Sequence, residues 1–260
     1  MRAIWNGAIG FGLVNIPIKL YSAVEDSSLD LDMLDKTDHS HIKYKRVNEN
    51  TGKEVKWENI VKGYEMEGRY IVLEEEDFIA ASPEKTRIFS ILQIVKEEEI
   101  DAVYFETPYF MEPQKNSESP YNLLLKALME TKMVGVGTFV LREKESLAVI
   151  RPYLEKYIIL QKIRFYEEIR SPEELKTKQT KPKPEEVKMA VALIEQLSDT
   201  FNPKKYKDTY TEELLEIIHK KANGTKIRKI KPIEEKTPAV DIMSQLKASL
   251  EASHKNKKIS

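Results

Sequence analysis

The first 170 residues contain one short β-prone segment after another, and this succession limits the possible folds more than any other feature. Apolar and polar residues alternate in residues 42–47, and the runs 134–141 and 146–166 are rich in strand-forming side chains. One segment, residues 116–133, has the spacing of a helix instead. Many short strands with a single helix are typical of a β-barrel with excursions, so we predict a mixed, mainly β core.

Three glycines lie close together in the opening stretch "WNGAIGFGLVN", at Gly7, Gly10 and Gly12. Their order is G-x-x-G-x-G, whereas a dinucleotide-binding loop needs G-x-G-x-x-G, and no Lys-Ser or Lys-Thr pair follows them as in a P-loop. We therefore expect these glycines to allow tight bends or bulges between short strands, and not to hold a phosphate.

The composition of the chain changes after residue 170. Residues 1–170 carry 23 Lys and Arg against 29 Asp and Glu, whereas residues 171–260 carry 19 against 14. The Lys- and Pro-rich segment 171–184 is typical of a linker, and apolar residues at helical spacing follow in 185–225. We predict a core domain in 1–170, this linker, a small α-helical region in 185–225, and in 226–260 a basic linker, a short amphipathic helix and a flexible tail.

The short helix in the last part has an apolar stripe on one side. It consists of Val240, Met243, Leu246 and Leu250. An amphipathic helix on a basic tether is typical of a segment that docks on a partner protein. Packing of the stripe against the chain's own domain is an equally open interpretation.

The sequence offers few residues for catalysis, since it has no cysteine and four histidines. Disulfides, thiolate metal sites and a cysteine nucleophile are excluded. His39 and His41 could share one face of a strand, but no third metal ligand is evident near them. The acidic runs 74–77 and 97–101 are more typical of a solvated face than of a metal-dependent nuclease, which is a weak alternative. We predict that the protein is not an enzyme and has no metal or cofactor.

Hydropathy and charge limit the cellular location and the binding partners that we expect for the protein. No stretch approaches the roughly 18 apolar residues of a membrane span, and the N-terminus lacks the pattern of a signal peptide, so we expect a cytoplasmic protein with no membrane partner. The net charge of −1 argues against a protein that coats DNA with its whole surface, but a local basic face for nucleic acid stays possible.

Six sequence blocks resemble, in the same order, those of bacterial Ku, the DNA-end-binding protein of non-homologous end joining. They read "RAIWNGAIGFGLVNIPIKLYSA", "IVKGYEMEGRYIVL", "EIDAVYFETPYFMEP", "FVLREKESLAVIRP", "FNPKKYKDTYTEEL" and "PAVDIMSQLKASLEAS". The resemblance therefore covers nearly the whole chain. In one departure, some relatives carry a pair of cysteines where this chain has "VNENTG" (47–52), so a metal role is not expected there.

The resemblance implies a ring-shaped homodimer. Each subunit would contribute the β-barrel and an extended arm, which we expect at about residues 104–141, and the arms would encircle duplex DNA that threads in from a free end. It also implies a protein associated with the nucleoid that holds DNA ends and recruits the multidomain ATP-dependent DNA ligase through C-terminal elements. The alternative, from another class of function, is a protein-interaction adaptor whose DNA binding is incidental.

Binding a duplex without reading its sequence requires Lys and Arg side chains that contact phosphates. We predict that the DNA-binding residues are Lys19, Lys43, Lys45, Arg46, Lys115, Lys132, Arg142, Lys144 and Arg151. For each of them the alternative is a solvated surface charge or an ion pair with a neighbour.

Overall fold

The structure is a computed structural model, and it describes residues 1–81, 87–141, 144–177 and 180–224. The chain divides into two compact units, one formed by Met1–Asp26 with Asp30–Ser171 and the other by Ser27–Leu29 with the chain from Pro172 onward. Among the described residues, no helix combines the length and the apolar character needed to cross a membrane.

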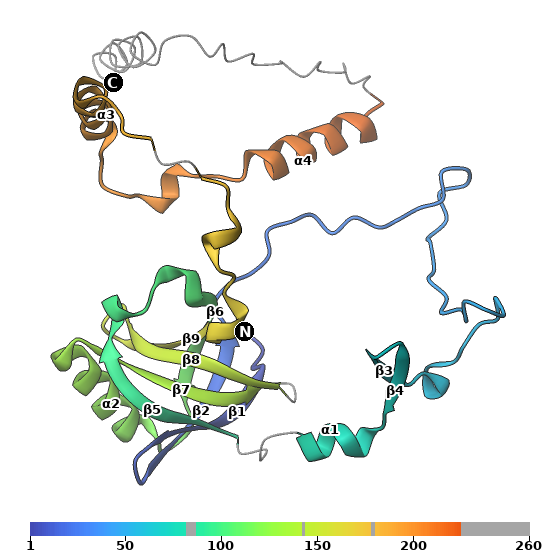
Figure 1. Cartoon of the computed structure of the whole chain (residues 1–260), viewed down its shortest axis with the longest axis horizontal. Helices are drawn as coiled ribbons and strands as arrows, with labels where there is room; N and C mark the ends of the chain where they lie inside the picture. The colour runs from blue at the N-terminus through green and yellow to red at the C-terminus, as the bar shows by residue number, and fades with distance from the viewer. Residues whose placement is uncertain (82–86, 142–143, 178–179, 225–260) are drawn as a thin grey trace. The chain divides into compact units, whose positions relative to one another are not determined.

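The first unit contains a closed seven-stranded β-barrel, as the sequence predicts (Figure 1). Its strands follow the order β1-β2-β6-β9-β8-β7-β5 around the barrel. Their bounds are β1 Trp5–Phe11, β2 Val14–Ser22, β5 Ile88–Lys96, β6 Phe105–Pro113, β7 Met133–Leu141, β8 Lys144–Tyr153 and β9 Tyr157–Ile163. Neighbouring strands are antiparallel except β1 and β5, which close the barrel in parallel through three residue pairs, Ala8↔Ile88 to Gly10↔Ser90.

The barrel interior is filled by alternate residues of its strands. In β2, Ile16, Ile18 and Leu20 are buried while the residues between them are not, which is the period of two expected for a strand with one covered face. Aromatic rings also belong to this core, and the rings of Trp5 and Phe139 meet edge to face with centroids 5.9 Å apart. These side chains belong to the larger of two apolar clusters, and the smaller one contains Val134, Val149 and Ile163.

The glycines of the opening stretch have two different roles. Gly12 has φ +59° and forms the two-residue turn between β1 and β2, as the tight-bend prediction requires. Gly7 lies within β1, where a Cβ atom would overlap the ring of Trp5. Gly137 in β7 is a similar case, because a Cβ atom there would overlap the carbonyl of Ser90 in the neighbouring strand.

Helix α2 (Glu118–Thr131) packs on the barrel core through Tyr121, Leu124, Leu125 and Leu128. The Tyr121 hydroxyl donates to the Met111 carbonyl at 2.9 Å and accepts from the Ile158 N–H at 2.7 Å, and burial raises its pKa. The helix is thus fastened to two neighbouring strands, β6 and β9.

The predicted position of the arm, residues 104–141, is wrong. This segment does not leave the barrel, because β6 pairs with β2 and β9 and β7 pairs with β5 and β8. The physical reason is burial: β6, α2 and β7 all contribute side chains to the barrel core, including Met111, Leu128 and Phe139. The remaining domain boundaries stay predictions.

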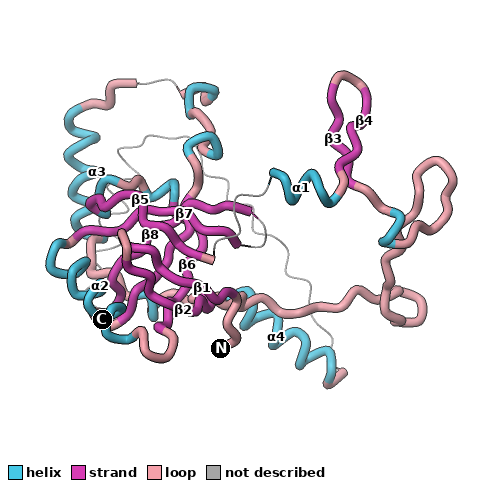
Figure 2. Tube along the Cα trace, turned by 90° about the horizontal axis from the view of Figure 1, so that it is seen from below, coloured by secondary structure: helices cyan, strands magenta, loops and turns pink. Residues whose placement is uncertain are grey.

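The segment that leaves the barrel is residues 23–87, which we call the excursion; it joins β2 to β5. It contains the 3-10 turn η1 Trp57–Asn59, strands β3 Lys62–Met66 and β4 Arg69–Leu73, and helix α1 Glu75–Ala81 (Figure 2). β3 and β4 form a two-stranded hairpin whose turn residues Glu67 and Gly68 both have positive φ, the type favoured in tight hairpins.

The excursion has no buried residue among those that the structure describes in it. Residues 42–47, which the sequence predicts as a strand, are irregular and flanked by isolated bridges, Leu34↔His41 and Val47↔Glu54. Alternation alone was insufficient here because, within the described residues, no strand lies beside this segment to complete a ladder.

The first unit also contains short 3-10 turns, and the described part of the second unit contains short turns and two helices. The turns are η2 Glu97–Glu99, η3 Ala102–Tyr104 and η4 Tyr166–Glu168 in the first unit, with η5 Pro172–Glu174 and η6 Pro203–Lys205 in the second. The helices are α3 Pro184–Leu197 and α4 Thr209–Ala222, and neither has a buried residue. The predicted stripe Val240, Met243, Leu246 and Leu250 lies outside the described residues.

Candidate nucleic-acid interface

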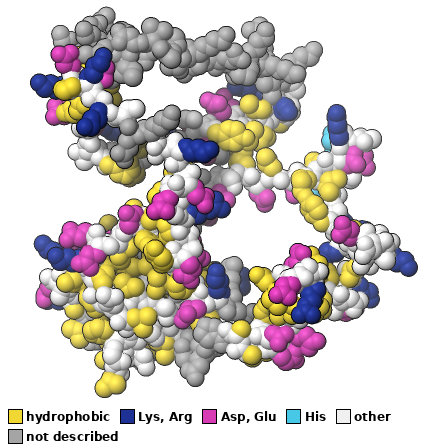
Figure 3. Space-filling model, viewed as in Figure 1, with side chains coloured by type: hydrophobic (Ala, Val, Ile, Leu, Met, Phe, Trp, Pro, Cys, Tyr) yellow, Lys and Arg dark blue, Asp and Glu magenta, His cyan; other side chains and the backbone are white. Residues whose placement is uncertain are grey.

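The predicted DNA-binding residues do not gather on one surface. Lys19 and Arg151 lie on barrel strands, Lys144 at the start of β8, and Lys115 and Lys132 in the turns on either side of α2, while the other three described residues belong to the excursion. Those three are Lys43, Lys45 and Arg46. Figure 3 shows basic and acidic side chains interspersed over the barrel, and Arg142 lies outside the described residues.

Lys19 and Arg151 share the outer face of one barrel wall, formed by β2, β6, β9 and β8. The pairing register joins Tyr21, Phe110, Ile159 and Arg151 in a row across this wall, and Ile159 is the buried member of the row. Lys19 lies directly opposite Glu112, and the Tyr21 hydroxyl donates to the same carboxylate at 2.5 Å, a bond that raises the pKa of Tyr21. The wall therefore presents a cation at each side with aromatic rings between them.

Arg151 has a carboxylate neighbour from outside the barrel. Its Nε lies 3.5 Å from an oxygen of Glu97, which belongs to η2, and 28% of its side chain is exposed. The turn η2 thus holds a carboxylate beside the Nε of Arg151.

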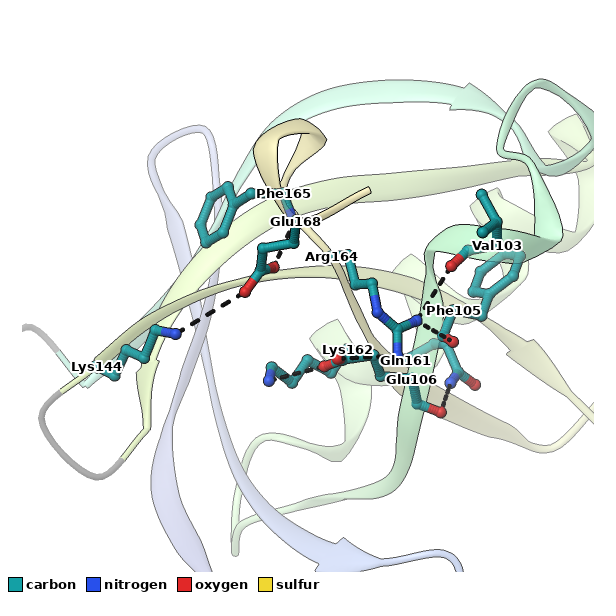
Figure 4. A network of polar contacts seen from close by, with 9 residues as sticks. All are labelled: Val103, Phe105, Glu106, Lys144, Gln161, Lys162, Arg164, Phe165 and Glu168. Carbon is teal, nitrogen blue, oxygen red and sulfur yellow. Dashed lines mark hydrogen bonds and ion pairs between the residues drawn. The ribbon is translucent and has the colours of Figure 1, made fainter. Parts of the chain in front are cut away.

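A network of two cations about one carboxylate ties β9 to β6 (Figure 4). The Lys162 ammonium lies 2.8 Å and the Arg164 guanidinium 3.3 Å from Glu106, and Arg164 also donates to the carbonyls of Val103 and Phe105 at 3.1 and 3.2 Å. The hydrogen bond from Lys162, with the nearby positive charges, lowers the pKa of Glu106. Both cations are therefore already satisfied within the barrel.

The sequence prediction missed Lys162 and Arg164. Alternation in "YIILQKIRFY" places them on the same strand face as Ile158 and Leu160, which are core residues. That pattern could have marked them as residues near the barrel interior. It could not have identified Glu106, because the partner is 56 residues away and the pairing is long-range.

Lys144 is held more loosely beside this network. Its ammonium lies 3.9 Å from Glu168 and 76% of its side chain is exposed. Glu168 is fixed independently, because its other oxygen accepts the Phe165 N–H at 2.8 Å (Figure 4). Lys144 can therefore leave the carboxylate while Glu168 stays in place.

The excursion carries its predicted cations near a tight loop. Lys45 lies 2.8 Å from Glu54, and the Arg46 guanidinium sits 4.7 Å from the centroid of the Trp57 ring, a cation–π contact. The Asn48 side chain closes the loop between them by accepting two backbone N–H groups at 3.0 Å. Residues 36–62 contain seven Lys and Arg against four Asp and Glu, so this part of the excursion is basic.

The histidines do not form a metal site in the described part of the chain. The His41 Nδ1 lies 3.9 Å from Asp32, and no group of three or more His, Asp or Glu side chains is arranged to hold a metal among the residues described.

Comparison with known proteins identifies the family. The family model for the Ku70/Ku80 beta-barrel domain matches residues 10–189. The non-homologous end joining protein Ku of Coxiella burnetii is 36% identical over 99% of this chain and 97% of its own length. Those of Bacillus subtilis and Archaeoglobus fulgidus are 37% and 36% identical, over 96% and 97% of this chain and 82% and 99% of their own lengths.

One solved structure, the SPOC domain of human PHD-finger protein 3, covers 62% of this chain and 95% of its own length with a TM-score of 0.31 and 12% identity. The assignment rests on the family model and on the relatives, which match almost the full chain. As the six sequence blocks predicted, the chain belongs to the Ku family.

Proposed function

We propose that this protein binds the ends of double-stranded DNA, without reading their sequence, in non-homologous end joining. The observation that carries the proposal is the near full-length similarity to relatives named non-homologous end joining protein Ku. In this proposal two subunits form a ring that threads onto an end and holds it, and the protein acts as a clamp and not as an enzyme.

The excursion is the segment that we propose as the arm of the ring. Its aromatic side chains are exposed, with Tyr44 at 79%, Trp57 at 71% and Tyr70 at 72%, and such a large apolar surface is typical of one that another protein covers. A second copy of the chain is the simplest cover, since most soluble oligomers are symmetric homo-oligomers. The basic part, residues 36–62, would then face the DNA.

The DNA contacts in this proposal are made to phosphates. Lys19 and Arg151 on the outer wall, Lys144 beside it and the cations of the excursion supply positive charge. None of the helices in the described residues is rich in the Arg, Asn and Gln that would read base edges. Lys115, Lys132 and Arg142 stay candidates for further phosphate contacts.

The second unit is where we place recruitment of the multidomain DNA ligase. Its helices expose apolar side chains, with Ile194 of α3 at 65% and Tyr210 of α4 at 72%. The stripe Val240, Met243, Leu246 and Leu250 remains the candidate docking segment. Mixing the protein with the ligase and measuring complex formation, with and without residues 226–260, tests this part of the proposal.

The central experiment compares two DNAs of identical sequence, one linear and one a relaxed closed circle, in binding titrations at two salt concentrations. We expect retention on the linear DNA alone, and weaker binding at the higher salt because phosphate contacts release counterions. Equal affinity for the closed circle would rule out threading from an end.

The exposed helix faces of the second unit also fit the adaptor function. Replacing Lys144 and Arg151 by alanine distinguishes the two: a clamp loses DNA affinity, whereas an adaptor keeps its partner binding and is otherwise unaffected. Lys126→Ala is the matched control, because Lys126 lies on α2 and pairs with Glu130 at 3.8 Å.

A further inference from the structure

Three of the cations proposed to contact DNA already have a carboxylate partner in the free protein. Lys45 pairs with Glu54 at 2.8 Å, Arg151 with Glu97 at 3.5 Å, and Lys144 with Glu168 at 3.9 Å. The pairs come from separate parts of the first unit: the excursion, the outer wall with η2, and the start of β8 with η4. The same arrangement therefore occurs at three places, two of which involve cations of β8.

The three carboxylates are exposed, which separates them from the carboxylate that holds the barrel together. The side chains of Glu54, Glu97 and Glu168 are 57%, 52% and 43% exposed, whereas that of Glu106 is 23% exposed and engages two cations at once. Exposed ion pairs contribute little to folding stability. Stability thus does not account for a carboxylate beside each of the three cations.

Such a carboxylate competes directly with a DNA phosphate, because both are anions that a Lys or Arg side chain binds through the same N–H donors. When DNA binds, the cation moves from the carboxylate to the phosphate. The carboxylate is left uncompensated and attracts a salt cation, so fewer counterions are released overall than the number of phosphate contacts implies. Glu168 is suited to this exchange, because the Phe165 N–H holds it in place after Lys144 leaves.

We propose that Glu54, Glu97 and Glu168 compete with DNA phosphates for these cations. They thereby lower the affinity for DNA and make that affinity less dependent on the salt concentration. The proposal rests on the DNA-binding function proposed above. Each cation can leave a phosphate and pair again with its carboxylate on the protein. The clamp should therefore stay mobile along the duplex.

The test replaces Glu54, Glu97 and Glu168 by glutamine, singly and together, in the full chain. Glutamine keeps the shape and, at residue 168, an amide oxygen that can still accept the Phe165 N–H. Affinity for a labelled linear duplex is measured by fluorescence anisotropy over a series of NaCl concentrations. Glu130→Gln is the control, because it removes the same charge from an exposed pair on α2 whose cation is not proposed to meet DNA.

We expect each variant to bind the duplex up to about fivefold more tightly, which is the range of an exposed ion pair. The slope of log affinity against log salt should steepen by up to about 0.9 for each carboxylate removed, and nearly additively in the triple variant. Thermal unfolding of each variant should match that of the unaltered protein, which excludes a folding defect as the cause.

Two results would overturn the proposal while leaving DNA binding intact. The first is a triple variant whose affinity and salt slope equal those of the unaltered protein. The second is a Glu130→Gln control that shifts both quantities as much as Glu97→Gln, since net charge alone would then explain the effect. A failure of the unaltered protein to bind linear duplex would instead overturn the DNA-binding function, and this inference with it.

Discussion

The barrel and the excursion both contain apolar side chains at strand spacing, and they differ in what covers those side chains. In the barrel, Ile18 and Leu20 are fully buried because every strand has a neighbour on each side. In the excursion, Trp57 and Tyr70 are more than two-thirds exposed, and no third strand joins the hairpin β3–β4 in the part of the chain that is described.

An apolar pattern therefore predicts a buried face but not which part of the molecule buries it. A two-stranded hairpin is at best marginally stable alone, so the excursion gains little from its own sheet. The described part of the chain supplies no cover for its apolar side chains, which fits a second subunit as the partner that we propose. The barrel, in contrast, should carry most of the folding energy of the first unit.

The largest effect should come from the barrel core. Phe139→Ala removes a ring that is 2% exposed and contacts the rings of Trp5 and Phe89, so the free energy of unfolding should fall by about 3–5 kcal/mol. Denaturant titration followed by circular dichroism measures it. Tyr70→Ala in the excursion is the counterpart, and a loss as large there would show that the two regions are equally well packed.

Two glycines in strands give a sharper contrast. Gly137→Ala places a methyl group against the Ser90 carbonyl in the barrel, and we expect a loss of about 1–3 kcal/mol because backbone must move. Gly63→Ala in β3 meets its nearest atom at 3.4 Å, an ordinary contact, so its effect should stay within about 0.5 kcal/mol. Thermal or denaturant unfolding of both variants measures the two losses of stability. A larger loss for Gly63→Ala than for Gly137→Ala would contradict the close approach of Gly137 to the Ser90 backbone.

The Glu106 network should make the barrel sensitive to acid. The pKa of Glu106 is lowered from its usual 4.5, so the stability it contributes is present above about pH 4.5 and is lost as the pH falls through the lowered pKa. Glu106→Gln should therefore cost about 1 kcal/mol at neutral pH and nothing at low pH. Unfolding titrations from pH 7 to pH 2 measure this, and a constant difference between the two proteins would refute the linkage.

The smallest expected effect is a change in tryptophan fluorescence, which reports separately on the barrel and on the excursion. Trp5 is 9% exposed in the barrel and Trp57 is 71% exposed in the excursion. With Trp57→Phe, the remaining emission should lie at shorter wavelength and resist acrylamide quenching, whereas with Trp5→Phe it should lie at longer wavelength and be quenched readily. If Trp57 becomes protected as the protein concentration rises, a second subunit covers the excursion; protection even at high dilution would mean that the chain itself covers it.

Much of the barrel can be predicted from the sequence because it rests on local alternation. The apolar residues of β2 and the run 134–141 mark strands that the structure contains, and Gly12 marks a turn. The position of the segment that we propose as the arm could not be found in this way. Segments 23–87 and 104–141 both alternate strand and helix patterns, and only long-range pairing decides which of them joins the barrel.

The candidate site could be predicted from the sequence even less well than the position of the excursion. The alternation about Ile150 places Arg151 on the outer face, but the partner carboxylate Glu97 comes from a turn 54 residues earlier. The local charge pattern also does not distinguish Lys162 from Lys144. Lys162 forms a close ion pair with Glu106, whereas Lys144 is loosely held by its carboxylate partner. The sequence shows which residues are charged, whereas the fold decides which charges remain available to a ligand.

The parallel seam between β1 and β5 has a mechanical consequence. The excursion re-enters the barrel at Arg87, whose carbonyl accepts the Ala8 N–H at 2.8 Å, and only three residue pairs follow between the two strands. Pairing of β5 with β7 begins at Ser90, so tension at this end of the excursion reaches the seam before it reaches the β5–β7 ladder. A pull along β5 strains those three pairs together in shear, and at this end of the excursion they should separate first.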